Sequence, residues 1–156
     1  MNHRESMVAK VAAAGWRRGA MLGLGSGTQF EMLLRGVPDL HLIGVDHFAR
    51  DDRRERLAEI GREFADRCTV HPCTTALASN FIPDRSLDFI YLDAGHRYGC
   101  VRSDLRLWWP KVRVGGWFGG HDFAPAYPGV VQAVTEKFGR AFTVDGNTVW
   151  QVGKSK

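Results

Sequence analysis

The sequence predicts an α/β fold, a doubly wound, Rossmann-like, mostly parallel sheet with an antiparallel hairpin strand at the C-terminus. Short apolar segments alternate along the chain with segments whose apolar residues recur at helical spacing. Such alternation is typical of a parallel sheet with helices on both faces and right-handed crossovers. Glycines, acids and histidines follow several of the apolar segments, where ligands bind in open parallel sheets.

The first half of the chain predicts three strands and three helices. The segment 28–35 is expected to end near Gly36 and Pro38. The segment 50–67 is heavily charged, but Leu57, Ile60 and Phe64 give it one apolar face. The predicted strands span residues 20–24, 41–45 and 68–71, and the predicted helices span residues 7–16, 28–35 and 50–67.

The second half predicts two more parallel strands, two helices and a closing hairpin. One face of a helix starting at Tyr98 carries Val101, Leu105 and Trp108. The predicted strands span residues 87–92 and 114–120, the second helix spans 129–138, and the hairpin pairs 141–144 with 148–152 around Gly146–Asn147.

The length of 156 residues fits one domain, with residues 1–19 as an N-terminal helix and residues 20–156 as the domain body. With 44% hydrophobic and 24% charged residues, the composition excludes collagen-like, disordered and disulfide-scaffold proteins. No apolar run approaches the length of a membrane span, so no membrane association is expected. Three cysteines without CxxC spacing favour a reduced, cytoplasmic location.

The chain is mildly basic, with a formal net charge of +4. The arginines, among them Arg102 and Arg106, are expected to form solvated faces, because no exposed aromatic residues are interleaved with them. Nucleic-acid binding is therefore the less favoured interpretation.

A glycine loop follows the first predicted strand. Gly23, Gly25 and Gly27 give GxGxG, with Ser26 between them and Thr28 where a dinucleotide motif has its third glycine. Asp46 follows Gly27 by 19 positions at the end of the second strand. A carboxylate at about this distance accepts the ribose hydroxyls of a bound nucleoside.

The loop and the acid together predict a nucleoside-containing ligand, and the segments after the second and third strands would complete its site. His47 lies next to Asp46. Thr74, Thr75 and Ala76 follow the third strand and would border the adenine, to whose edge either threonine could offer a hydroxyl.

Two carboxylates and two imidazoles follow the fourth and fifth predicted strands. Asp93 and His96 follow one strand, and His121 and Asp122 the other. Asp93 and Asp122 are candidates to hold Mg²⁺, and His96 is a candidate general base. Alternatively, His121 and the acids hold a transition metal, or Asp93 positions the ligand while His121 and Asp122 brace the loop.

The chain resembles class I S-adenosylmethionine-dependent methyltransferases, in particular the small methyltransferase family 24. The resemblance covers about residues 20–152 and is carried by strand-end motifs of the type D-G-x-H and H-D. In this sequence they read Asp93-Ala94-Gly95-His96 and Gly119-Gly120-His121-Asp122, separated by the helical segment 101–112.

The resemblance implies that S-adenosylmethionine is the cofactor and that residues 20–156 bind it. Gly23, Gly25, Ser26 and Gly27 would face its methionine and ribose, Asp46 and His47 the ribose, and Thr75 and Ala76 the adenine. Asp93 would also contact the cofactor and act with His96 in catalysis. Some relatives hold a divalent metal at positions matching Asp93 and Asp122, although His121 stands where they tend to carry a carboxylate.

The implied reaction is O-methylation of a small-molecule hydroxyl, of the sugar or natural-product type. Residues 1–19 would form only a partial lid, so the loop 122–129 or a second subunit of a homo-oligomer would complete the acceptor site.

Three other functions stay open: a non-catalytic nucleoside-binding domain, an RNA methyltransferase and an NAD-dependent oxidoreductase. The oxidoreductase is disfavoured by the GxGxG spacing and by the lack of a Tyr-x-x-x-Lys pair.

Overall fold

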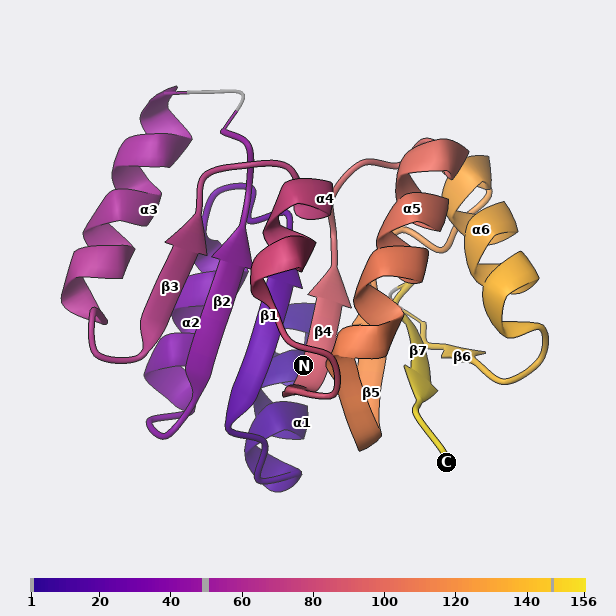
Figure 1. Ribbon diagram of the computed structural model, residues 1–156, viewed down its shortest axis with the longest axis horizontal. Coiled ribbons are helices and arrows are strands. Elements are labelled where there is room, and N and C mark those ends of the chain that lie inside the picture. Colours follow the sequence, from indigo (N-terminus) through magenta and orange to yellow (C-terminus); the bar gives the residue numbers. More distant parts are fainter. Residues whose placement is uncertain (1, 49–50, 147) are drawn as a thin grey trace.

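A seven-stranded sheet lies between two layers of helices in the computed structural model, which describes residues 2–48, 51–146 and 148–156 (Figure 1). The strand order is β3-β2-β1-β4-β5-β7-β6. Strands β1 to β5 pair in parallel, whereas β7 runs antiparallel to β5 and β6 antiparallel to β7. This confirms the predicted doubly wound sheet and its antiparallel C-terminal hairpin.

The predicted elements occur in the predicted order, and the structure adds a short helix at Thr75–Ala78 that the sequence analysis did not predict. The strands are β1 Arg18–Leu22, β2 His41–Val45, β3 Cys68–His71, β4 Leu87–Leu92, β5 Val112–Gly120, β6 Thr143–Val144 and β7 Trp150–Gly153. The α-helices are α1 His3–Ala13, α2 Thr28–Gly36, α3 Asp51–Glu63, α4 Thr75–Ala78, α5 Tyr98–Trp108 and α6 Pro128–Phe138. Two short 3₁₀ turns, η1 Ser79–Phe81 and η2 Trp109–Lys111, follow α4 and α5.

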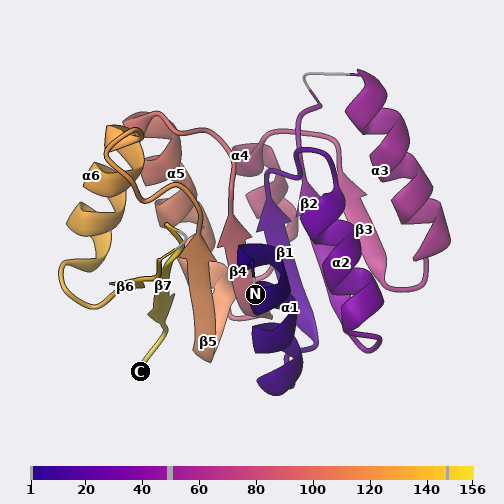
Figure 2. The same cartoon turned by 180° about the vertical axis from the view of Figure 1, so that it is seen from behind.

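Each face of the sheet has its own apolar core. Helices α4, α5 and α6 cover one face, where Trp108, Phe118 and Trp150 are buried (Figure 1). Helices α1, α2 and α3 cover the other, where Phe30 and Phe89 are fully buried (Figure 2). Burial of both faces explains why the central strands are nearly continuous apolar segments.

Strand β1 lies two residues earlier than predicted. Gly23 has a φ of +84°, which takes the chain out of the extended conformation after Leu22. At the other end, the Asp88 carboxylate accepts hydrogen bonds from the backbone N–H groups of Arg17 and Arg18, at 2.8 and 2.9 Å. Apolar composition could not show either effect, because both depend on backbone geometry.

Helix α3 ends at Glu63, four residues before its predicted end, and the predicted start at Arg50 lies outside the described residues. The chain turns after Glu63, and the Arg67 guanidinium beyond the turn donates to the Leu34 carbonyl in the last part of α2 at 2.6 Å and to two carbonyls after that helix. The segment 7–16 was predicted as the first helix. The structure instead begins α1 at His3, with Asn2 and Glu5 forming a reciprocal capping box.

The predicted hairpin turn at Gly146–Asn147 includes Asn147, which lies outside the described residues. On either side of it, the Asp145 N–H donates to the Val149 carbonyl at 2.9 Å. No helix in the described part of the chain is long and apolar enough to cross a membrane.

Candidate active site

The ends of the parallel strands gather the predicted site residues at one edge of the sheet, hereafter the carboxyl edge. From β1 the chain builds β2 and then β3 on one side of that strand. It then crosses back and builds β4 and β5 on the other side of β1. Four predicted residues each donate a backbone hydrogen bond to a neighbouring strand: Gly23 to Val45 (2.8 Å), Asp46 to His71 (3.2 Å), Asp93 to Leu22 (2.7 Å) and His121 to Leu92 (3.1 Å).

The glycine loop passes close to the end of β4. A Cβ on Gly23 would lie 2.0 Å from the Asp93 carbonyl oxygen. The ends of β1 and β4 are therefore so close that only glycine fits at position 23. Gly25 has a φ of +54°, but a Cβ there would meet no protein atom within 4 Å. Ser26 is exposed, and Gly27 is the N-cap of α2. The loop therefore presents open backbone to a ligand at Gly25 and Ser26.

Asp46 connects the loops that follow β1 and β2 through hydrogen bonds to both. Its Oδ2 accepts from the Leu24 N–H at 2.9 Å, and its Oδ1 accepts from the Phe48 N–H at 2.8 Å. Each carboxylate oxygen has two lone pairs, so both can accept one further hydrogen bond from a ribose hydroxyl. His47, beside it, is exposed.

The segment after β3 is anchored to α5. Thr74 caps α4 by accepting from the Leu77 N–H at 3.2 Å, and Thr75 donates its hydroxyl proton to Asp104 Oδ1 at 2.5 Å. Both threonine hydroxyls are thus engaged within the protein, and Ala76 remains exposed. Burial raises the pKa of Asp104 to about 6, and the Thr75 hydrogen bond opposes this rise.

Asp122 lies between two imidazoles. Its Oδ2 is 2.6 Å from His96 Nε2, and its Oδ1 is 2.8 Å from His121 Nδ1. Asp122 has a φ of +64°, so the turn after β5 aims its carboxylate at both rings. The side chain of His96 is 44% exposed, whereas that of Asp122 is 15% exposed, so the pair has a covered carboxylate and an accessible base.

Asp93 joins this group from the end of β4. One ligand-type atom from each of Asp93, His96 and Asp122 lies within 4.8 Å of the others. Surrounding protein atoms desolvate the Asp93 carboxyl and raise its pKa, and the Asp122 charge adds to this, although His121 acts in the opposite direction. The structure therefore brings Asp93, His96, His121 and Asp122 together, as their strand-end positions predict.

His3 of α1 also reaches the site, and the sequence reasoning did not select it. Its ring lies 4.8 Å from that of His121, centroid to centroid. Burial lowers the pKa of His3, and the charge of His121 lowers it further. Asn2 and Glu5 carry the capping-box signal for a helix starting at His3, but no local pattern links that helix to the carboxyl edge.

A hollow of about 750 Å³ opens beside His96. It is lined by residues 95–98, Cys100 and residues 126–129. The Tyr127 ring lies 4.6 Å from the His96 ring at a tilt of 32°. The predicted acceptor wall, the loop 122–129, therefore contacts the candidate base.

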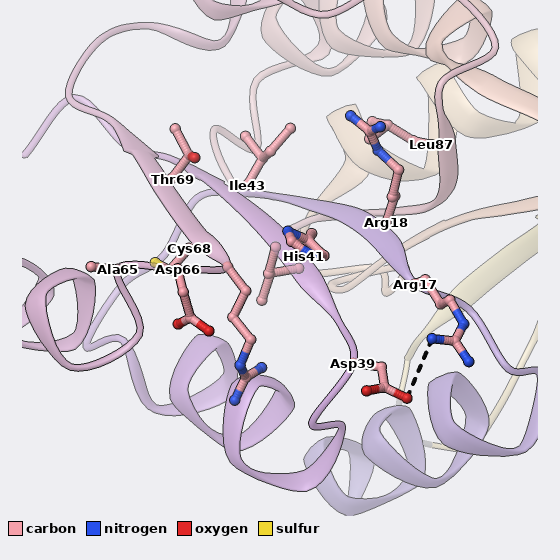
Figure 3. Close-up of a pocket in the computed structure, with 12 residues that line it drawn as sticks. Arg17, Arg18, Asp39, His41, Ile43, Ala65, Asp66, Cys68, Thr69 and Leu87 are labelled. Carbon is pink, nitrogen blue, oxygen red and sulfur yellow. Dashed lines mark ion pairs between the residues drawn. The ribbon is translucent and has the colours of Figure 1, made fainter.

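A second hollow, of about 530 Å³, lies at the opposite edge, where Arg18 and His41 begin β1 and β2 (Figure 3). There Arg17 and Asp39 form an ion pair at 3.3 Å. None of the predicted site residues lines this hollow. Ligands of doubly wound sheets bind at the carboxyl ends of the strands, so the hollow beside His96 is the candidate site.

Comparison with known proteins identifies the family of the chain. A family model described as a methyltransferase domain matches residues 21–123. A search of curated proteins by sequence finds no match.

Many solved structures share the fold, among them three methyltransferases. The TDP-rhamnose 3′-O-methyltransferase CalS11 of calicheamicin biosynthesis has 16% identity and a TM-score of 0.76, covering 98% of this chain and 80% of its own. The Podospora anserina methyltransferase PaMTH1, bound to S-adenosylhomocysteine, has 13% identity and a TM-score of 0.75, with coverages of 98% and 78%. A Burkholderia thailandensis 1,6-didemethyltoxoflavin N1-methyltransferase has 14% identity and a TM-score of 0.67, with the same coverages.

Proposed function

Because this chain belongs to the family of methyltransferase domains, we propose that it transfers the methyl group of S-adenosylmethionine to a hydroxyl of a small molecule. The observation that carries the proposal is the His96–Asp122 pair, at 2.6 Å, beside Asp93 and the glycine loop. Two of the structural neighbours support the two halves of the reaction: PaMTH1 binds S-adenosylhomocysteine, and CalS11 methylates a sugar hydroxyl.

The cofactor is proposed to lie along the carboxyl edge from β3 to β4. The backbone at Gly25 and Ser26 faces its methionine part, Asp46 accepts from the ribose hydroxyls, and Ala76 borders the adenine. Asp46 suits this role because its carboxylate is already fixed by two backbone N–H groups and keeps free lone pairs. A fixed acceptor loses little conformational entropy when the ribose binds.

The reaction needs alignment and a base. The acceptor oxygen attacks the methyl carbon, the carbon–sulfur bond breaks, and the sulfonium leaves as the neutral thioether S-adenosylhomocysteine. The hydroxyl proton must then pass to a base, and His96 is proposed to take it. Alignment of the two reactants supplies much of the remaining acceleration.

Asp122 is proposed to position His96 for this step. Its hydrogen bond with His96 Nε2 favours the tautomer that carries a proton there, which leaves Nδ1 as the accepting nitrogen. The Asp122 charge also stabilises the imidazolium that forms. His121 holds the other oxygen of Asp122 at 2.8 Å, so the carboxylate is fixed from both sides.

A divalent metal is the second candidate for the Asp93, His96 and Asp122 cluster, because the three donors lie within 4.8 Å of one another. These donors fit Mg²⁺ poorly, however. One of the three is an imidazole nitrogen, whereas Mg²⁺ prefers oxygen. Each Asp122 oxygen is also already paired with an imidazole. The proposed transfer therefore uses the protein's own side chains.

Residues 1–19 are proposed to act as a partial lid. Helix α1 packs on the α2 face of the sheet, and its first residue, His3, touches His121. The helix thus closes the site on the side of His121, while the loop 122–129 forms the wall on the side of His96. This arrangement leaves the hollow beside His96 for a small acceptor.

Calorimetric titration of S-adenosylhomocysteine into the purified protein tests the cofactor assignment, with NAD⁺ as comparison ligand. Micromolar binding of S-adenosylhomocysteine alone is expected. A folded protein that binds only NAD⁺, or neither ligand, would overturn the proposal.

Methyl transfer to mixed phenolic and sugar acceptors then tests the base, with formation of S-adenosylhomocysteine as the readout. His96→Asn should abolish turnover and leave S-adenosylhomocysteine affinity unchanged. His41→Asn, at the opposite edge, is the matched control and should behave as wild type. Full activity of His96→Asn would exclude His96 as the base, and an inactive wild type that binds the cofactor would favour a non-catalytic domain.

A further inference from the structure

The residues that line the hollow beside His96 carry a net positive charge. Its volume of about 750 Å³ lies within the range of small-molecule sites. Among its described lining residues, Arg97 is the one permanent charge, and none of them is acidic. An anionic group in the hollow would therefore meet a positive partner in Arg97, while the nearby carboxylates of Asp122 and Glu136 are paired with His96 and with the Tyr98 hydroxyl.

Arg97 is free to bind such a group. It is exposed and directly precedes α5, next in sequence to the candidate base His96. In the described part of the chain its guanidinium forms no hydrogen bond or ion pair, unlike Arg35 or Arg56, which pair with glutamates. A guanidinium presents a planar fork of N–H donors that matches a carboxylate or phosphate.

The hollow also has an aromatic wall. Tyr127 is 37% exposed while its ring packs against His96, so part of the ring remains open to a ligand. The hydroxyl of Tyr98 is already used, because it donates to Glu136 at 2.6 Å. Aromatic rings of this kind favour planar aromatic ligands through offset or edge-to-face packing.

Close backbone contact fixes the two walls of the hollow relative to each other. A Cβ on Gly129 would lie 2.5 Å from both the His96 carbonyl oxygen and the Tyr98 backbone nitrogen. The first turn of α6, which directly follows Tyr127, is therefore in close contact with the segment that carries Arg97. Arg97 and Tyr127 thus line the same hollow from two segments that touch each other.

We propose that the methyl acceptor is a planar aromatic hydroxyl compound that carries an anionic substituent. Arg97 binds the anion, the ring packs against Tyr127, and the hydroxyl faces His96. This inference rests on the proposed function, because it names the class of acceptor for the same site.

Pairs of probes that differ only in charge test the inference. We choose 4-hydroxybenzoate, 3,4-dihydroxybenzoate and 4-hydroxycinnamate, each with its neutral amide, and titrate them into protein saturated with S-adenosylhomocysteine. At least one carboxylate should bind about tenfold more tightly than its amide, the ratio expected for a charge-assisted contact at an exposed site. Failure of every carboxylate to bind, or equal binding of acid and amide, would overturn the inference.

Variants of Arg97 test whether this residue causes the preference for the carboxylate over the amide. Arg97→Gln should reduce the preference for the carboxylate to within about twofold and leave the amide affinity unchanged, whereas Arg97→Lys should keep part of it. Arg106→Gln, an exposed arginine further along α5, is the matched control and should keep the full preference. A preference that survives Arg97→Gln, or that Arg106→Gln removes equally, would refute the role of Arg97.

Failure of this inference can be told apart from failure of the proposed function. The cofactor titration and the formation of S-adenosylhomocysteine test methyl transfer without reference to the acceptor's charge. Turnover of neutral acceptors with no Arg97-dependent preference would leave the methyltransferase standing and reject the anionic class. Arg97-dependent carboxylate binding in a protein that does not bind S-adenosylhomocysteine would confirm an anion site but reject the acceptor role.

Discussion

Replacing Asp104 by asparagine should remove a pH dependence of stability that the wild-type protein shows. Asp104 is 4% exposed on α5 and accepts the Thr75 hydroxyl, so it joins α4 to the larger helix. Burial raises its pKa from 3.8 to about 6. The folded protein therefore keeps a proton on this group that the unfolded chain releases at lower pH.

The sign and size of the pH dependence follow from the difference between the pKa values of Asp104 in the folded and unfolded states. The contribution of Asp104 to stability is fully present below pH 3.8 and is lost as the pH rises through about 6. At about 1.36 kcal/mol per pH unit, the loss reaches about 1 kcal/mol at pH 4.5 and about 3 kcal/mol at pH 7.5. Asparagine has no proton to release and keeps an acceptor oxygen for Thr75. The free energy of unfolding of Asp104→Asn minus that of wild type should therefore increase by about 2 kcal/mol between these pH values.

Urea unfolding followed by tryptophan fluorescence at pH 4.5 and pH 7.5 measures this difference. Asp39→Asn is the control, because Asp39 is 71% exposed and forms only a surface ion pair with Arg17. The free energy of unfolding of Asp39→Asn minus that of wild type should change little between the two pH values. A constant difference for Asp104→Asn would mean that folding does not raise the pKa of Asp104 above its value in the unfolded chain, and would refute the reasoning.

Three further outcomes are expected. Asp46→Ala should weaken S-adenosylhomocysteine binding by about 1.5–3 kcal/mol in calorimetry, the scale of a charge-assisted hydrogen bond, and unchanged affinity would place the ribose elsewhere. Gly25→Val should block cofactor binding, because its side chain would occupy the open backbone of the loop, where a Cβ meets no protein atom within 4 Å; the φ of +54° strains valine, so a lower melting temperature is expected as well, and normal binding would contradict the role of the loop. The melting temperature should be equal in chelator and in excess magnesium, and a magnesium-dependent rise that Asp93→Asn removes would restore the metal assignment.

The fold class, and the meeting of the candidate site residues at one edge of the sheet, could both be predicted from the sequence. Apolar segments alternating with amphipathic ones require helices on both faces of a parallel sheet, and parallel strands place their carboxyl ends together. Asp46, Asp93 and His121 each directly follow a strand, so their meeting at one edge follows from topology alone. Boundaries were less accurate, since β1 ends where Gly23 takes a positive φ, which composition does not encode.

The pairing of side chains was decided only by the tertiary structure. That Asp122 bridges His96 and His121, and that the Thr75 hydroxyl turns to Asp104, depends on side-chain directions set by a left-handed residue and by helix packing. His3 comes to His121 from more than 100 residues away because α1 packs across the sheet. Local sequence patterns report which face of an element is apolar, but they hold no information on contacts between residues distant in the chain.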